Sequence, residues 1–174
     1  MSAIDYDLRK IRGVAFDVDG VLSTSTIPLS PDGEPLRMVS TKDGYALQLA
    51  VKKGLEIAII TGGNTRSVEK RFRSLGIEEI HLGSAHKLPV FLDWMERKGL
   101  QKEEVAFMGD DIPDLRCLRV AGLACAPHDA CWEARETAHY ISRFDGGYGC
   151  ARDLLEQILK AKGQWLDDAD AFGW

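Results

Sequence analysis

The chain has 174 residues, a formal net charge of −5, 45% apolar residues and 28% charged residues. This length suits one domain with a full hydrophobic core, and the acidic balance argues against nucleic acid as the main partner, because a phosphate backbone calls for a basic face. No apolar run reaches the length of a membrane span, and residues 1–10 lack the apolar core of a signal peptide, so we expect a cytoplasmic protein with no membrane partner.

Apolar runs alternate with amphipathic segments along the chain, beginning with a strand at 13–16. A Pro-Asp-Gly turn then separates residues 26–29 from 36–39, which we expect to pair as a small hairpin flap. Helices are predicted at 43–53, 67–75, 87–98, 115–121, 130–138 and 151–161, and further strands at 55–60, 80–82, 105–108, 123–126 and 140–141. This alternation predicts an α/β fold with a doubly wound, mostly parallel sheet and helices on both faces. We expect a single domain over 1–162 and a C-terminal tail over 163–174.

Two aspartates, Asp17 and Asp19, directly follow the first predicted strand and precede Gly20. An ordinary Asp-Gly turn would explain them structurally. However, taking an unpaired carboxylate out of water costs several kcal/mol, so a buried strand end has no structural use for two of them. The pair therefore suggests a cation and a reaction.

Polar residues follow three of the predicted strands, namely Asp17 and Asp19, then Thr61 and Gly62, then Asp110, Asp111 and Asp114. Ligands bind at the carboxyl ends of strands in open α/β sheets, so these residues should converge. Several carboxylates in one place need a cation, and all-oxygen ligation favours Mg²⁺ over zinc. Lys87 and the N–H groups around Gly62, at a predicted helix N-terminus, would add an anion site. A carboxylate beside a bound phosphate can attack phosphorus, which is phosphoryl transfer.

At this point the residues resemble the four motifs of the haloacid dehalogenase (HAD) superfamily of phosphatases. The matching residues, in chain order, are Asp17-x-Asp19-Gly20, Thr61, Lys87 and Gly109-Asp110-Asp111-x-x-Asp114. The resemblance covers nearly the whole chain and implies a Rossmann-like HAD core. The two places where such enzymes insert a cap domain hold segments too short for a domain here. A capless enzyme with an open site needs a macromolecular substrate or a neighbouring subunit as its lid.

The resemblance implies a role for each matching residue. Asp17 would be the nucleophile and a Mg²⁺ ligand, and Asp19 the general acid that then becomes the base. Thr61 and Gly62 would hold the phosphoryl oxygens, while Lys87 balances the negative charge.

The metal site would take further oxygens from the same motifs. Asp110 would ligate Mg²⁺, and Asp111 and Asp114 would either ligate it or support the ligands. Asp19 is a further candidate ligand, with the backbone carbonyl of Val18 as the preferred one at this strand end. For Asp114, capping of the helix at 115 is the alternative.

Three stretches further resemble the 3-deoxy-D-manno-octulosonate 8-phosphate (KDO 8-phosphate) phosphatases, namely 16–22, 41–44 and 146–153. This resemblance implies hydrolysis of KDO 8-phosphate to KDO and phosphate, a step in lipopolysaccharide precursor synthesis, through an aspartyl-phosphate. It also implies a homotetramer in which neighbours complete the site. Lys42 and Arg152 are candidates to meet the sugar acid's carboxylate or phosphate, with surface ion pairs as the alternative.

Three features depart from that family's pattern. Gly63 stands where many members have Arg, and Asp153 stands where Glu is common. The tail carries Trp165, Phe172 and Trp174, and we expect it to pack on a neighbouring subunit, the alternative being a disordered end.

Other functions stay open. A nonulosonate 9-phosphate phosphatase is the rival enzyme, and a non-catalytic HAD-like oligomerisation module would be expected to have lost Asp17 or Asp19. A phospho-accepting receiver domain would not need Asp-x-Asp. A zinc site at Cys125, His128 and Cys131 lacks a fourth ligand, so we expect the cysteines to pack in the core.

Overall fold

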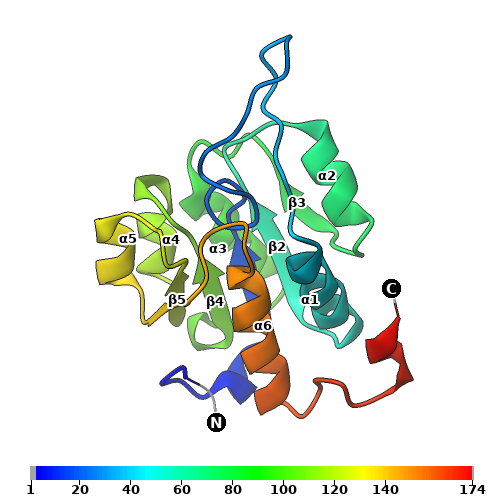
Figure 1. Cartoon of the computed structure of the whole chain (residues 1–174). Helices are drawn as coiled ribbons and strands as arrows, with labels where there is room; N and C mark the ends of the chain where they lie inside the picture. The colour runs from blue at the N-terminus through cyan, green and yellow to red at the C-terminus, as the bar shows by residue number, and fades with distance from the viewer. Residues whose placement is uncertain (1–2, 174) are drawn as a thin grey trace.

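The computed structural model describes residues 3–173 and contains one six-stranded, fully parallel sheet in the order β3-β2-β1-β4-β5-β6 (Figure 1). The strands are β1 Gly13–Phe16, β2 Glu56–Ile60, β3 Glu79–His81, β4 Val105–Met108, β5 Leu123–Ala126 and β6 Tyr140–Ile141. From β1 the chain builds outward to one edge and then, from β4, to the other. The topological switch point therefore lies between β1 and β4, where ligands bind in doubly wound sheets.

Helices cover both faces of the sheet (Figure 1). They are α1 Thr41–Lys52, α2 Arg66–Arg73, α3 Lys87–Arg97, α4 Leu115–Leu118, α5 Trp132–Thr137 and α6 Cys150–Ala161. Short 3₁₀ turns are η1 Leu8–Lys10, η2 Lys102–Glu104, η3 Ile112–Asp114 and η4 Ala169–Phe172. One core packs α1, α2 and α6 on the first face, and a second core packs α3, α4 and α5 on the other. The predicted α/β architecture with a doubly wound sheet is confirmed.

Strand β1 shows why its sequence is apolar throughout. Val14 and Phe16 point into the first core, and Ala15 points into the second, all fully buried. A parallel strand with helices on both faces has no solvent side, so it reads as a continuous apolar run. This run carries the chain without a break to Asp17.

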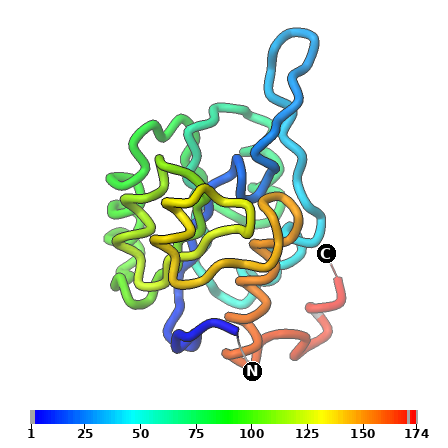
Figure 2. The backbone as a smooth tube through the Cα atoms, turned by 60° about the vertical axis from the view of Figure 1, so that its left-hand side comes forward, coloured from blue at the N-terminus to red at the C-terminus, as the bar shows by residue number. Residues whose placement is uncertain are grey.

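The predicted hairpin forms a projecting loop with little regular pairing (Figure 2). A single antiparallel bridge joins Leu29 and Pro35, and Gly33 occupies the turn with φ +83°. The Leu36 N–H donates to the Pro28 carbonyl at 2.8 Å, but Pro28 has no N–H to return the bond, so the ladder does not continue beyond this pair. The expected strands at 26–29 and 36–39 are therefore absent, although the flap itself, residues 26–39, is present.

The described part of the tail folds back on α1 (Figure 1). Trp165 contacts Tyr45 edge-on with ring centroids 6.0 Å apart, and Lys53 lies 2.7 Å from Asp167 and 2.5 Å from Asp168. Phe172 is exposed, and Trp174 lies outside the described residues. The predicted contact of the tail with a neighbouring subunit stays a prediction.

Across residues 3–173, we find no helix with the length and apolar character needed to span a bilayer. The free thiols of Cys117, Cys125 and Cys150 are buried, as expected for core packing, whereas Cys131 is only half-buried.

Candidate active site

The carboxyl ends of β1 and β4 lie side by side. Phe16 and Met108 are register partners, and the Asp17 N–H donates to the Met108 carbonyl at 3.1 Å. Neighbouring parallel strands therefore deliver the chain segments at Asp17 and Asp110 to the same edge of the sheet, as the sequence predicts.

Three carboxylates meet at this edge. Asp17, Asp110 and Asp114 each offer an oxygen, and these oxygens lie within 4.8 Å of one another. Gly20 makes room for the group, because it has φ +85° and a Cβ there would lie 1.9 Å from Asp110 Oδ2. A glycine at this point of the turn is thus a requirement of the close approach.

Lys87 is the first residue of α3, which packs on the same face of the sheet as α4. Its Nζ lies 2.8 Å from Asp17 Oδ1 and 2.7 Å from Asp114 Oδ1, and its side chain is 5% exposed. Asp114 is fully buried, and its other oxygen accepts the N–H groups of Asp110 at 3.0 Å and Asp111 at 3.4 Å. Asp114 makes no side-chain cap on α4, so its carboxylate instead ties Lys87 to the loop after β4.

Burial and like charge shift the titration of this cluster. Desolvation, followed by repulsion from Asp114, raises the pKa of Asp17 to about 7. Desolvation and the Asp17 and Asp114 charges raise the pKa of Asp110 to about 8. Burial opposes the charge on Lys87, but the carboxylates of Asp17 and Asp114 outweigh it and raise the Lys87 pKa above its usual range. The site therefore carries an excess of negative charge that one lysine does not neutralise.

The cluster fits a hard divalent cation. Asp110 Oδ1 is buried without a hydrogen-bond partner in the part of the chain the structure describes. An orphaned buried carboxylate oxygen is costly unless a ligand satisfies it, and oxygen-only donors suit Mg²⁺ or Ca²⁺ rather than zinc. Asp17, Asp110 and Asp114 are thus the residues placed to hold such an ion.

Three of the groups predicted to ligate the metal lie outside the group of three carboxylates or already have other partners. The Val18 carbonyl accepts the N–H groups of Val21 at 3.2 Å and Ser23 at 2.8 Å, which leaves it little capacity for a metal. Asp111 is exposed and lies outside the carboxylate group, where Asp114 takes its place. The Asp19 carboxylate is also outside the group, since it binds an arginine.

That arginine, Arg37, is a site residue that sequence reasoning missed. Its Nε lies 2.6 Å from Asp19 Oδ1 and its Nη2 lies 2.8 Å from Oδ2. In the sequence, Arg37 is only a single basic residue within the flap. The available signal was Gly63, because the side chain missing there, where many family members have Arg, leaves space for another group.

The loop after β2 carries Thr61, which is buried, and Gly62, which is exposed. The Thr61 hydroxyl accepts the Gly63 N–H at 3.1 Å and keeps its own proton to donate. Helix α2 begins only at Arg66, so Gly62 belongs to the loop and not to a helix N-terminus. The predicted anion site would therefore be formed by loop amides and not by a helix end.

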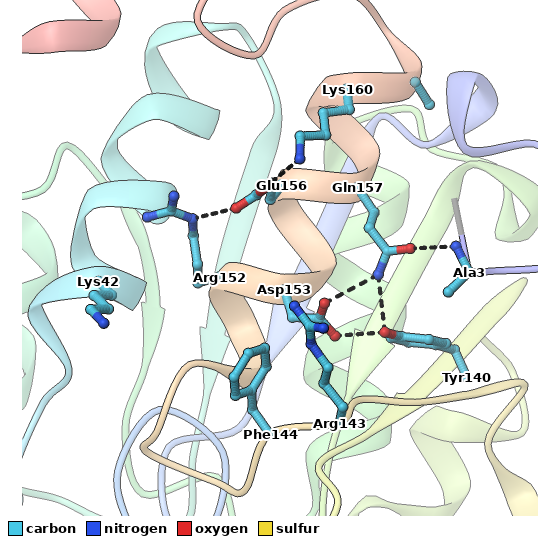
Figure 3. Close-up of a pocket in the computed structure, with 11 residues that line it drawn as sticks. Ala3, Lys42, Tyr140, Arg143, Phe144, Arg152, Asp153, Glu156, Gln157 and Lys160 are labelled. Atoms are coloured by element: carbon cyan, nitrogen blue, oxygen red, sulfur yellow. Dashed lines mark hydrogen bonds and ion pairs between the residues drawn. The ribbon is translucent and has the colours of Figure 1, made fainter. Parts of the chain in front are cut away.

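Lys42 and Arg152 line a separate groove of about 730 Å³ along α6 (Figure 3). Arg152 Nε lies 2.8 Å from Glu156 Oε2, and its guanidinium stacks over Trp165 at 4.5 Å. None of the three clustered carboxylates is among the described residues that line this groove. Within one chain, Arg152 therefore forms a surface ion pair, which was the alternative to a contact with the substrate.

Comparisons with known proteins point to one family of enzymes. The model of the haloacid dehalogenase-like hydrolases matches residues 39–122. The 3-deoxy-D-manno-octulosonate 8-phosphate phosphatase KdsC of Escherichia coli K12 is 38% identical over 159 residues, which cover 91% of this chain and 84% of that protein.

Solved structures of similar proteins superpose closely. A probable YrbI family phosphatase from Pseudomonas syringae has a TM-score of 0.87 at 39% identity, covering 91% of this chain and 90% of that one. The KDO 8-phosphate phosphatase of Moraxella catarrhalis, solved with a magnesium ion, a phosphate ion and KDO, has a TM-score of 0.86 at 34% identity, with 90% of each chain covered.

Proposed function

This chain is a phosphatase that belongs to the haloacid dehalogenase-like hydrolase family, and we propose that it releases phosphate from a phosphorylated 2-keto-3-deoxy sugar acid, KDO 8-phosphate. The observation that carries the chemistry is the buried Lys87, held between Asp17 and Asp114 beside an Asp110 oxygen that has no hydrogen-bond partner among the described residues. This arrangement supports a site for a dianion and a cation. The similarity to KdsC supports the choice of sugar acid.

The first half of the reaction transfers the phosphoryl group to the protein. An oxygen of Asp17 forms a bond to phosphorus while the bond from phosphorus to the sugar oxygen breaks, giving an aspartyl-phosphate. Asp19 gives its proton to the leaving sugar oxygen, which departs as the alcohol. Thr61 and the amides of the loop at Gly62 bind the phosphoryl oxygens, and Lys87 offsets their charge.

The second half restores the enzyme. Asp19, now a carboxylate, takes a proton from a water molecule whose oxygen attacks phosphorus. The bond between phosphorus and the Asp17 oxygen breaks, so inorganic phosphate leaves and Asp17 is a carboxylate again. Mg²⁺, bound by Asp17, Asp110 and Asp114, would supply the positive charge that lets two anions approach each other.

A substrate screen tests the proposal. We expect Mg²⁺-dependent phosphate release from KDO 8-phosphate, with kcat/KM at least about tenfold above that for glucose 6-phosphate, which lacks the carboxylate; tenfold corresponds to about 1.4 kcal/mol of differential binding. A preference for the 9-phosphate of a nonulosonate would replace the eight-carbon substrate with the nine-carbon one. Failure to hydrolyse any of these esters with Mg²⁺ present would refute a sugar-acid phosphatase.

A homotetramer in which neighbours close the site is part of the same proposal. The flap projects from the body of the molecule (Figure 2), and it exposes Leu29, Leu36 and Met38 at 64%, 50% and 56%. Apolar side chains gathered on a projecting segment favour contact with another protein surface. Light scattering of the purified chain measures the mass, and a monomer at assay concentration would contradict this arrangement.

A further inference from the structure

The side chain of Arg37 is mostly buried, although much of the flap is exposed. Its side chain is 8% exposed, whereas its neighbours Leu36 and Met38 are at least half exposed. The flap therefore turns this side chain inward and its apolar neighbours outward. An inward guanidinium needs partners for its charge, and the structure supplies them at the active site.

The guanidinium holds Asp19 at two points. Nε and Nη2 contact the two carboxylate oxygens at 2.6 Å and 2.8 Å, and Nη1 donates to Thr65 Oγ1 at 2.6 Å. A two-point contact of this kind fixes the orientation of a carboxylate as well as its position. Asp19 is 34% exposed and would otherwise have rotational freedom.

The loop after β2 is shaped around the same guanidinium. A Cβ on Gly63 would lie 2.6 Å from Arg37 Nη2 and 3.0 Å from Cζ. Gly63 thus leaves the space that the Arg37 guanidinium occupies, and the hydroxyl of Thr65 accepts a hydrogen bond from it. Two independent segments, the flap and this loop, therefore cooperate to hold one side chain against Asp19.

We propose that Arg37 is a positioning residue that orients Asp19 for proton transfer to the leaving oxygen. The inference rests on the proposed function, in which Asp19 protonates the departing sugar oxygen as the bond from Asp17 to phosphorus forms. In the proton-transfer step, one Asp19 oxygen keeps its contact with the guanidinium while the other carries the proton to the leaving oxygen, and in this proposal Arg37 itself contacts neither phosphorus nor the leaving group. It couples the flap to the acid-base step, so a displaced flap leaves Asp19 unaligned.

The test compares two leaving groups in the holoenzyme with saturating Mg²⁺. A sugar phosphate leaves as a poor alkoxide and needs the acid, whereas p-nitrophenyl phosphate leaves as a stable phenolate and does not. The measured quantity is kcat/KM, because it reports only the steps up to release of the leaving group and excludes hydrolysis of the aspartyl-phosphate. For Arg37→Ala we expect a loss of about 30-fold or more with the sugar phosphate, since general acids contribute 10²–10⁴-fold, and of less than about threefold with p-nitrophenyl phosphate.

Two further variants and a control accompany it. Gly63→Ala removes no polar group, but its Cβ displaces the guanidinium, so it should reproduce the same asymmetry. Arg37→Lys offers one point charge in place of the fork and should fall between Arg37→Ala and the native chain. Arg9→Ala removes a two-point contact to Asp7, at 2.9 Å and 3.3 Å, that is exposed and remote from the site, and should leave both rates unchanged.

The outcomes separate cleanly. Equal losses with both phosphates would mean that Arg37 binds the phosphoryl group or only anchors the flap, and would overturn the positioning role. Unchanged rates would overturn it as well. A native chain that fails to hydrolyse either ester would instead defeat the proposed function, independently of Arg37. Thermal unfolding and Mg²⁺ titration of each variant check that fold and metal binding persist.

Discussion

Replacing Asp17 by Asn separates stability from activity. In the metal-free protein Asp17 is 6% exposed, and burial together with Asp114 raises its pKa to about 7 from an ordinary 3.8. At 1.36 kcal/mol per unit, keeping this carboxylate charged in the fold costs on the order of 4 kcal/mol at pH 8. An amide avoids this cost and still accepts the Lys87 contact.

The expected result has opposite signs for the two measurements. Burying the amide costs about 1–3 kcal/mol, so the unfolding free energy at pH 8 without metal should rise by about 1–3 kcal/mol. Phosphate release should fall by at least about 10³-fold, because an amide is not a nucleophile for phosphorus. No phosphorylated protein should appear in the intact mass during turnover.

The assays are urea denaturation in EDTA and phosphate release with Mg²⁺. Asp93→Asn is the matched control, since Asp93 is 63% exposed and pairs with Arg97 on the surface of α3. It should change neither quantity appreciably. Retained turnover in Asp17→Asn would refute the nucleophile assignment. A loss of stability would refute the electrostatic reasoning.

Other changes test the charge balance and the groove. Lys87→Met leaves buried carboxylates without their cation and should lower the unfolding free energy by about 3–5 kcal/mol in urea titrations without metal, with part of the loss restored by Mg²⁺. In the metal-free protein, the folded pKa values of about 7 for Asp17 and about 8 for Asp110 exceed the unfolded value of 3.8, so the fold binds more protons than the unfolded chain and the melting temperature should fall as pH rises from 4 to 8. Ligation needs the charged carboxylates, so the increase in melting temperature caused by Mg²⁺ should grow over the same range, which calorimetry measures. Lys42→Ala should raise KM for the sugar acid and leave p-nitrophenyl phosphate hydrolysis unchanged, if the groove along α6 meets the substrate's carboxylate in the oligomer.

The strands were predictable because each is a local apolar pattern. β1, β4, β5 and β6 begin and end where the sequence places them. The first three are buried on both faces, which leaves no polar residue inside the run, whereas β6 is a short edge strand with Ile141 exposed. The flap was less predictable, because its pairing depends on which N–H groups are available, and Pro28, which accepts the Leu36 N–H, has none to donate in return.

The residues of the candidate site also differ in how far the local sequence predicts their positions. Asp17, Lys87 and Asp110 follow from strand ends and a helix start, which local sequence marks. The place of Asp114 beside Lys87 depends on the 3₁₀ turn after β4, which folds its carboxylate back onto the N–H groups of Asp110 and Asp111. Sequence spacing does not distinguish that arrangement from an ordinary helix cap.

The sequence alone determined the doubly wound sheet and the strand ends at which Asp17, Asp19, Thr61 and Asp110 lie, because periodicity and chain order fix which end of each parallel strand a residue follows. Only the tertiary structure decided which side chains touch. Arg37 reaches Asp19 because the flap folds over a loop that has no side chain at Gly63, and that contact joins segments with no shared local pattern. Proximity between distant segments is a property of packing, and packing is specified by the whole chain at once.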